Sequence, residues 1–91
     1  MKIFEIKPEF CDSIPDVLLN GILYISEKWH TAIHLCACGC NQKVVTPLYN
    51  GSWSMKKDGD MISLTPSIGN FTGEKTYHAH YFIANNKIIW C

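Results

Sequence analysis

Two turn signals constrain the fold of this chain more than any other feature of its sequence. Asp58-Gly59 and Asn85-Asn86 are pairs that close β-hairpins, because Gly and Asn tolerate the positive φ that tight turns need. The runs that flank them are rich in apolar and β-branched residues and cover residues 52–56, 61–65, 77–83 and 87–90. No segment shows a long pattern of period 3.6. The sequence therefore predicts a mostly β protein, a small single domain with an antiparallel sheet and two hairpins.

The other elements are shorter and less distinct. Strands are predicted at residues 1–6, 21–26, 29–35 and 43–48. Pro47 favours an edge position or a terminus for the last of these strands, because proline cannot donate a ladder hydrogen bond. Residues 13–19 predict a turn or a single helical turn with Pro15 near its start. Residues 66–70, Pro-Ser-Ile-Gly-Asn, predict a loop.

The composition is that of one folded domain, residues 1–91. The chain is 47% hydrophobic and 18% charged, and eight Lys and Arg balance eight Asp and Glu. This neutral balance argues against a dedicated nucleic-acid binder. No apolar run approaches the roughly 18 residues that span a bilayer, and the first residues lack a signal-peptide core. We expect a cytoplasmic protein without a membrane partner.

Three of the five cysteines fall within the stretch Leu-Cys-Ala-Cys-Gly-Cys, at Cys36, Cys38 and Cys40. In a reducing compartment, clustered cysteines are more often metal ligands than disulfides. Gly39 allows a sharp turn that would bring Cys40 to the same ion as the other two thiols. The cluster therefore predicts a metal site.

A tetrahedral zinc ion needs a fourth ligand from elsewhere in the chain. His80 is the preferred candidate, with His78 and Cys91 as alternates. Such a site would staple the middle of the chain to its C-terminal hairpin. Cysteine and histidine also suit iron, but zinc is favoured where no redox role is needed.

The sequence favours a structural role for this metal over a catalytic one. The His-Glu-x-x-His and zinc-deaminase motifs are absent. Glu74 is the only carboxylate near the histidines in sequence, and Ser67 is interpreted as a turn residue. Tyr81, Phe82 and Trp90 are expected in the core, although an exposed subset would form a surface for a partner. Taken together, these features favour a protein without enzymatic activity over an enzyme.

The chain also resembles a small family of bacterial and phage proteins. The resemblance runs through Thr-Ala-Ile-His-Leu-Cys-Ala-Cys-Gly-Cys (31–40), Pro-Ser-Ile-Gly-Asn (66–70), His-Tyr-Phe-Ile (80–83) and Ile-Ile-Trp (88–90), in order and with similar spacings. Members of that family usually have a cysteine three residues before the histidine of His-Tyr-Phe-Ile. Tyr77 occupies this position here, so the resemblance leaves the fourth zinc ligand open.

The resemblance implies a zinc-stabilised accessory or protein-interaction module of a bacterial ubiquitin-like conjugation system, with a role in antiphage defence. Genes for ubiquitin-like, activating-enzyme-like and conjugating-enzyme-like proteins often lie beside those of the family, and such proteins are the expected partners. The resemblance supplies no activity. Two alternatives stay open: a zinc-dependent hydrolase or conjugation enzyme, and a small nucleic-acid-binding protein.

Overall fold

The described part of the chain is built from β-strands alone. The computed structural model describes residues 2–49, 52–71 and 77–91, and the side chains of residues 70, 71, 77 and 78 lie outside that description. Within it no α-helix forms, which confirms the mostly β class. The strands are β1 (Lys7–Phe10), β2 (Ile22–Ser26), β3 (Thr31–Leu35), β4 (Lys43–Pro47), β5 (Ser54–Asp58), β6 (Met61–Phe71), β7 (Tyr77–Ala84) and β8 (Lys87–Trp90).

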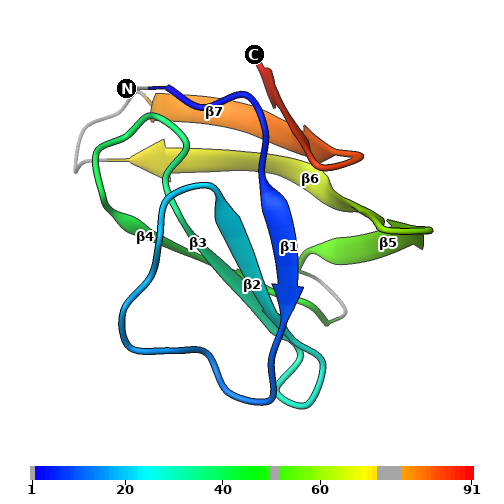
Figure 1. Cartoon of the computed structure of the whole chain (residues 1–91). Coiled ribbons are helices and arrows are strands. Elements are labelled where there is room, and N and C mark those ends of the chain that lie inside the picture. Colours follow the sequence, from blue (N-terminus) through cyan, green and yellow to red (C-terminus); the bar gives the residue numbers. More distant parts are fainter. Residues whose placement is uncertain (1, 50–51, 72–76) are drawn as a thin grey trace.

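The strands form two sheets of four, where the sequence had predicted one antiparallel sheet. The first sheet has the order β1-β2-β3-β4 and the second β5-β6-β7-β8 (Figure 1). All neighbouring strands are antiparallel except β1 and β2, which run parallel. Pro47 ends β4 at an edge of the first sheet, as predicted.

Both predicted hairpins are present. Gly59 has φ 62° in the β5–β6 turn, and Asn85 and Asn86 have φ 49° and 64° in the β7–β8 turn. The Asn86 side chain also links the two turns. Its amide oxygen accepts a hydrogen bond from the Ile62 N–H at 2.8 Å, and its nitrogen donates to the Asp60 carbonyl at 3.1 Å.

The first predicted strand is displaced along the chain. Residues 4–6 run beside β8, where the Ile88 N–H donates to the Phe4 carbonyl and the Ile6 N–H to the Asn86 carbonyl. The chain then enters the first sheet as β1. Pro8 is tolerated there because β1 is an edge strand and needs no ladder donor on its open side. Of the two alternatives predicted for residues 13–19, a turn or a helical turn, the helical turn is wrong, since this segment contains bends and no helix.

The predicted loop at residues 66–70 is also wrong, because β6 continues through it to Phe71. The ladder with β7 is irregular at this point: Leu64 pairs with Ile83, and the next regular pair is Ile68 with Tyr81. Pro66 lies inside the irregular segment and has no N–H to donate. A β-bulge of this kind redirects the side chains near it. Ser67 is one of them.

The core lies between the two sheets. Leu23, Ile25 and Ala32 from the first sheet share one buried cluster with side chains of the second. The residues that the second sheet contributes to this cluster are Ile62, Leu64, Ile68, Ala79, Tyr81, Ile83 and Ile88. Alternate residues of β7 therefore point inward, and the residues between them form the outer face of the second sheet. No helix in the described ranges is long and apolar enough to cross a membrane.

Candidate functional site

A serine and a histidine meet on the outer face of the second sheet. Ser67 on β6 and His80 on β7 are both partly exposed, and the Ser67 Oγ lies 2.8 Å from the His80 Nε2. Gly69 is directly opposite His80 in the ladder. Since Gly69 has no side chain, the imidazole can reach diagonally across the face to Ser67, a distance that ring side chains span in sheets.

This pair has the geometry of a nucleophile and its base. A neutral imidazole with the proton on Nδ1 accepts the Ser67 hydroxyl proton through Nε2. A hydroxyl and a histidine nitrogen at 2.6–3.2 Å are the recurring arrangement of activated serine nucleophiles. Both residues are partly exposed, so the pair lies at the surface of the sheet and not in the core.

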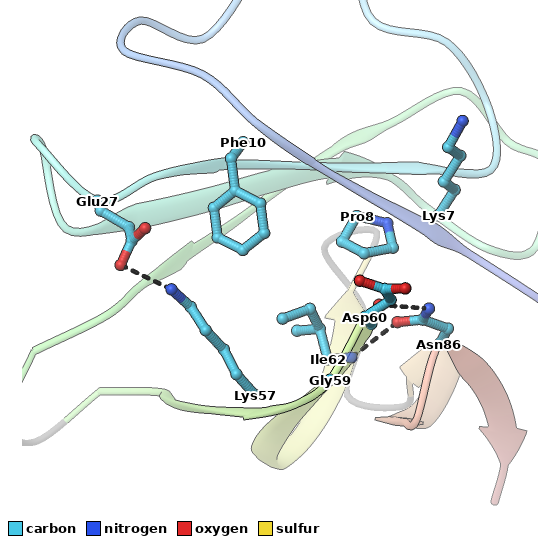
Figure 2. Close-up of a pocket in the computed structure, with 9 residues that line it drawn as sticks. All are labelled: Lys7, Pro8, Phe10, Glu27, Lys57, Gly59, Asp60, Ile62 and Asn86. Atoms are coloured by element: carbon cyan, nitrogen blue, oxygen red, sulfur yellow. Dashed lines mark hydrogen bonds and ion pairs between the residues drawn. The ribbon is translucent and has the colours of Figure 1, made fainter.

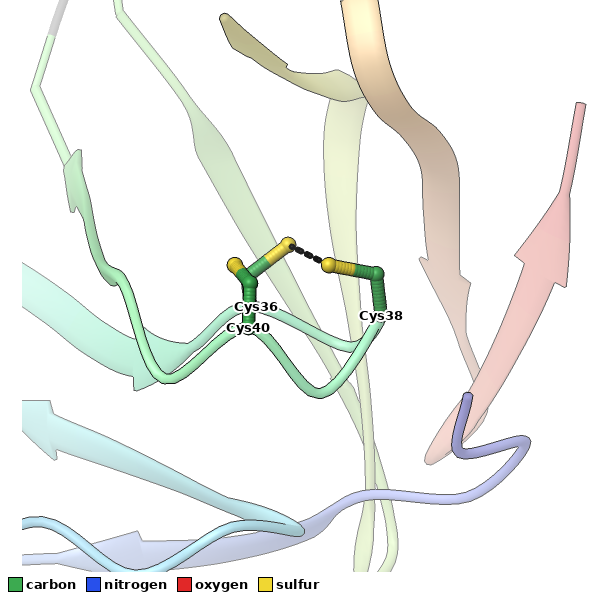
Figure 3. A group of neighbouring side chains, drawn as sticks. All are labelled: Cys36, Cys38 and Cys40. Atoms are coloured by element: carbon green, nitrogen blue, oxygen red, sulfur yellow. Dashed lines mark hydrogen bonds between the residues drawn. The ribbon is translucent and has the colours of Figure 1, made fainter. Parts of the chain in front are cut away.

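The cysteines form a second site, in the loop that follows β3. Cys36 is buried, Cys38 is half-buried and Cys40 is exposed, and their three Sγ atoms all lie within 4.8 Å of one another (Figure 3). The loop is a tight turn, in which the Gly39 N–H donates to the Cys36 carbonyl and the Cys36 N–H to the Gln42 carbonyl. Gly39 has φ 89°, which supports the sequence argument for a glycine there.

These three thiols could hold a metal ion. A tetrahedral zinc with Zn–S bonds of about 2.3 Å places two ligand sulfurs about 3.8 Å apart. The Sγ atoms of Cys36 and Cys38 are 3.4 Å apart, so the donor set fits such an ion with small adjustments. Burial, together with hydrogen bonds to Cys40 and Cys36, raises the pKa of the Cys38 thiol to about 11. A bound cation would reverse this by stabilising the thiolate.

A buried polar contact connects the cysteine loop to β7. The Tyr81 hydroxyl lies 2.7 Å from the His34 Nε2 and accepts a hydrogen bond from the Ala37 N–H at 3.4 Å. Burial lowers the pKa of His34 to about 4 and raises that of Tyr81 well above its ordinary value, so both are neutral at pH 7. The sequence predicted a link between residues 36–40 and the C-terminal hairpin. Tyr81 supplies a link there, one residue away from His80.

The structure places the predicted ligands in different positions. Cys36, Cys38 and Cys40 come together as predicted. His80 does not belong to this cluster of side chains that could share a metal ion; its Nε2 contacts the Ser67 Oγ. Cys91 is exposed, and its N–H donates to the His80 carbonyl. The side chain of His78 and the whole of Glu74 lie outside the described residues.

Ser67 is the functional candidate that the sequence reading missed. Its neighbours Pro66 and Gly69 are typical of loops, and this led to its interpretation as a turn residue. A signal was nevertheless present, since the segment recurs as a motif in the resembled family. Only the strand register shows that Ser67 and His80 share a face.

A groove of about 670 Å³ lies elsewhere, between β1 and the two turns of the second sheet (Figure 2). Its lining residues are Lys7, Pro8, Phe10, Glu27, Lys57, Gly59, Asp60, Ile62 and Asn86. Lys57 already pairs with Glu27 at 3.0 Å and lies over the Phe10 ring. The Ser67–His80 pair is not part of this lining, so the groove is separate from the site described above.

Comparison with known proteins identifies the family. No curated protein and no solved structure matches the chain. A sequence model of one family matches residues 10–91, almost the whole chain, and that family is described as "Bacterial ubiquitination-like system serine protease (BubE)". The match places the protein in a bacterial ubiquitination-like pathway, in agreement with the resemblance noted from the sequence. The chain belongs to the BubE family.

Proposed function

We propose that this protein is a serine peptidase of its ubiquitination-like pathway, with Ser67 as nucleophile and His80 as general base. The observation that carries the proposal is the 2.8 Å contact between the Ser67 Oγ and the His80 Nε2, two partly exposed residues on the outer face of the sheet. The family's description as a serine protease supports it. The proposed substrate is the ubiquitin-like modifier of the pathway. The enzyme would cleave behind the C terminus of the modifier, either in a precursor with extra residues or in a conjugate with another protein.

The reaction needs two steps at this pair. Ser67 attacks the scissile carbonyl carbon while His80 takes the hydroxyl proton, and His80 then gives that proton to the departing amine. The carbon–nitrogen bond breaks and an ester to Ser67 remains. Water then attacks the ester with His80 again as base, which releases the carboxylic acid and restores the Ser67 hydroxyl.

The test is cleavage of a ubiquitin-like protein from such a system, carrying a peptide fused to its C terminus. The purified protein is expected to release the peptide, and Ser67→Ala to abolish the release. Ser54→Ala, at an exposed serine of β5, is the matched control and should cleave normally. Equal cleavage by Ser67→Ala would overturn the assignment of the nucleophile. Absence of cleavage by the unsubstituted protein would instead favour a non-catalytic accessory module that binds a pathway component.

We further propose that the cysteine loop binds a structural zinc through Cys36, Cys38 and Cys40. The mutual proximity of the three sulfurs supports this. When bound, the ion would cross-link the loop and hold its thiols as thiolates. The fourth ligand is proposed from three candidates. The sequence favoured His80, with His78 and Cys91 as alternates. Because His80 contacts Ser67, we propose His78 or Cys91 as the fourth ligand.

A further inference from the structure

Two apolar side chains lie on the same sheet face as the Ser67–His80 pair. Phe82 on β7 is 41% exposed and Ile89 on β8 is 48% exposed, and the two residues are direct partners in the ladder. Cβ atoms of direct partners are about 5 Å apart. The two side chains therefore form one small apolar patch, defined here as the Phe82–Ile89 patch.

The strand register sets this patch beside the reactive groups. Ala79, Tyr81 and Ile83 are buried in the core, so His80 and Phe82 share the outer face of β7 two residues apart. Ser67 contacts His80 across the ladder at 2.8 Å, so both reactive groups lie on the sheet face that carries the patch.

Position distinguishes this patch from the other exposed apolar side chains. Val17, Trp29 and Val45 are exposed to a similar or greater extent, but they belong to the first sheet and its loops. Met61, also exposed, belongs to the second sheet but lies at the β5–β6 turn. Single exposed apolar residues are ordinary on protein surfaces. Phe82 and Ile89 are paired, and they are continuous with a serine and a histidine in hydrogen-bond contact.

We infer that the Phe82–Ile89 patch binds an apolar side chain of the peptide substrate within a few residues of the scissile bond. The inference rests on the proposed peptidase function. The occupant is an extended peptide that lies across the sheet face, with its carbonyl carbon at Ser67 and an aliphatic or aromatic side chain on the patch. Burial of such a side chain contributes about 1–3 kcal/mol, equivalent to roughly 10- to 200-fold in kcat/KM.

The experiment uses fluorogenic peptides that share one scissile bond and carry Leu, Phe, Ser or Asp in turn at each position around it. The unsubstituted protein is expected to prefer Leu or Phe over Asp at one position by 10-fold or more. The double variant Phe82→Ser with Ile89→Ser should lose this preference through a higher KM. Val45→Ser is the matched control, since Val45 is 47% exposed on the other sheet, and should retain the preference.

Labelling by a small fluorophosphonate separates this inference from the proposed function. The probe reports the reactivity of Ser67 without needing the patch, so the double variant should be labelled at the rate of the unsubstituted protein. Normal labelling together with an unchanged apolar preference in the double variant would overturn the inference alone. Normal labelling of the unsubstituted protein, together with equal cleavage of the Leu, Phe and Asp peptides, would also overturn the inference alone. Absence of labelling in the unsubstituted protein would overturn the peptidase function, and this inference with it.

Discussion

The cysteine loop gathers three thiol side chains within five consecutive residues, whereas the Ser67–His80 pair joins two strands across 13 residues of sequence. The loop begins at the edge of the core, with Cys36 buried, while the pair lies on an outer face. A tight turn is enough to bring the three thiols together. The pair depends on the register of β6 against β7 and on the bulge between Leu64 and Ile68. The first kind of site is visible in a sequence, and the second is visible only in a fold.

The largest expected effect separates the two roles that His80 could have. His80→Gln should lower kcat by at least roughly 10³-fold with little change in KM, because it removes the base and keeps the size of the side chain. Bound zinc, measured by plasma mass spectrometry, should stay the same. His30→Gln, at an exposed turn histidine, is the control. Loss of zinc together with a fall in melting temperature would show that His80 is a metal ligand, as the sequence first suggested.

The next effect tests the cysteine loop by itself. Cys36→Ser should remove the bound metal and lower the melting temperature by about 10 °C or more, because the cross-link within the loop is lost. Chelation of the unsubstituted protein should have the same result. Cys11→Ser, at a cysteine distant from the loop in sequence, should change neither quantity. A Cys36→Ser protein that keeps its metal and its melting temperature would contradict the structural-zinc proposal.

A smaller effect tests the link between the two regions. Tyr81→Phe removes the hydroxyl that contacts the His34 Nε2 and the Ala37 N–H, and leaves these buried groups without that partner. The expected cost is about 1–3 kcal/mol, which corresponds to a melting temperature lower by about 5–15 °C. Tyr49→Phe, at an exposed tyrosine, should have no effect. An unchanged melting temperature for Tyr81→Phe would show that the loop and β7 are held together by other contacts.

The smallest effect concerns Cys91. Cys91 is exposed and follows β8 directly, and its N–H donates to the His80 carbonyl, so it lies beside His80. Cys91→Ser should leave the zinc content and the melting temperature unchanged if His78 completes the site. A drop in zinc content comparable to that of Cys36→Ser would identify Cys91 as the fourth ligand.

The sequence predicted most of the fold, because hairpin turns are local. Asn85-Asn86 and Asp58-Gly59 predict tight turns because Asn and Gly tolerate positive φ. The division into two sheets was not predictable in this way, because it depends on contacts distant in sequence, such as those of residues 4–6 with β8. Parallel pairing of β1 with β2 has no local signal either.

The two candidate sites differ in the same way: one depends on residues close together in sequence, and the other on contacts distant in sequence. Cys36, Cys38 and Cys40 were found from spacing alone, because core packing rarely requires three thiols so close together in sequence. Ser67 was missed because Pro66 and Gly69 have the composition of a loop, while the strand continues through them. The same two residues help to build the site. Pro66 interrupts the ladder and Gly69 leaves space for the His80 ring.

The central claim is that Ser67 is the reactive residue of this protein and the cysteines are not. Reaction of the metal-loaded protein with a fluorophosphonate, followed by intact-mass measurement and peptide mapping, tests it most directly. The account predicts one adduct on Ser67, which is absent from Ser67→Ala and from His80→Gln and present at the normal rate in Cys91→Ser. A folded, metal-loaded protein without an adduct on Ser67, or with its adduct on another residue, would contradict it.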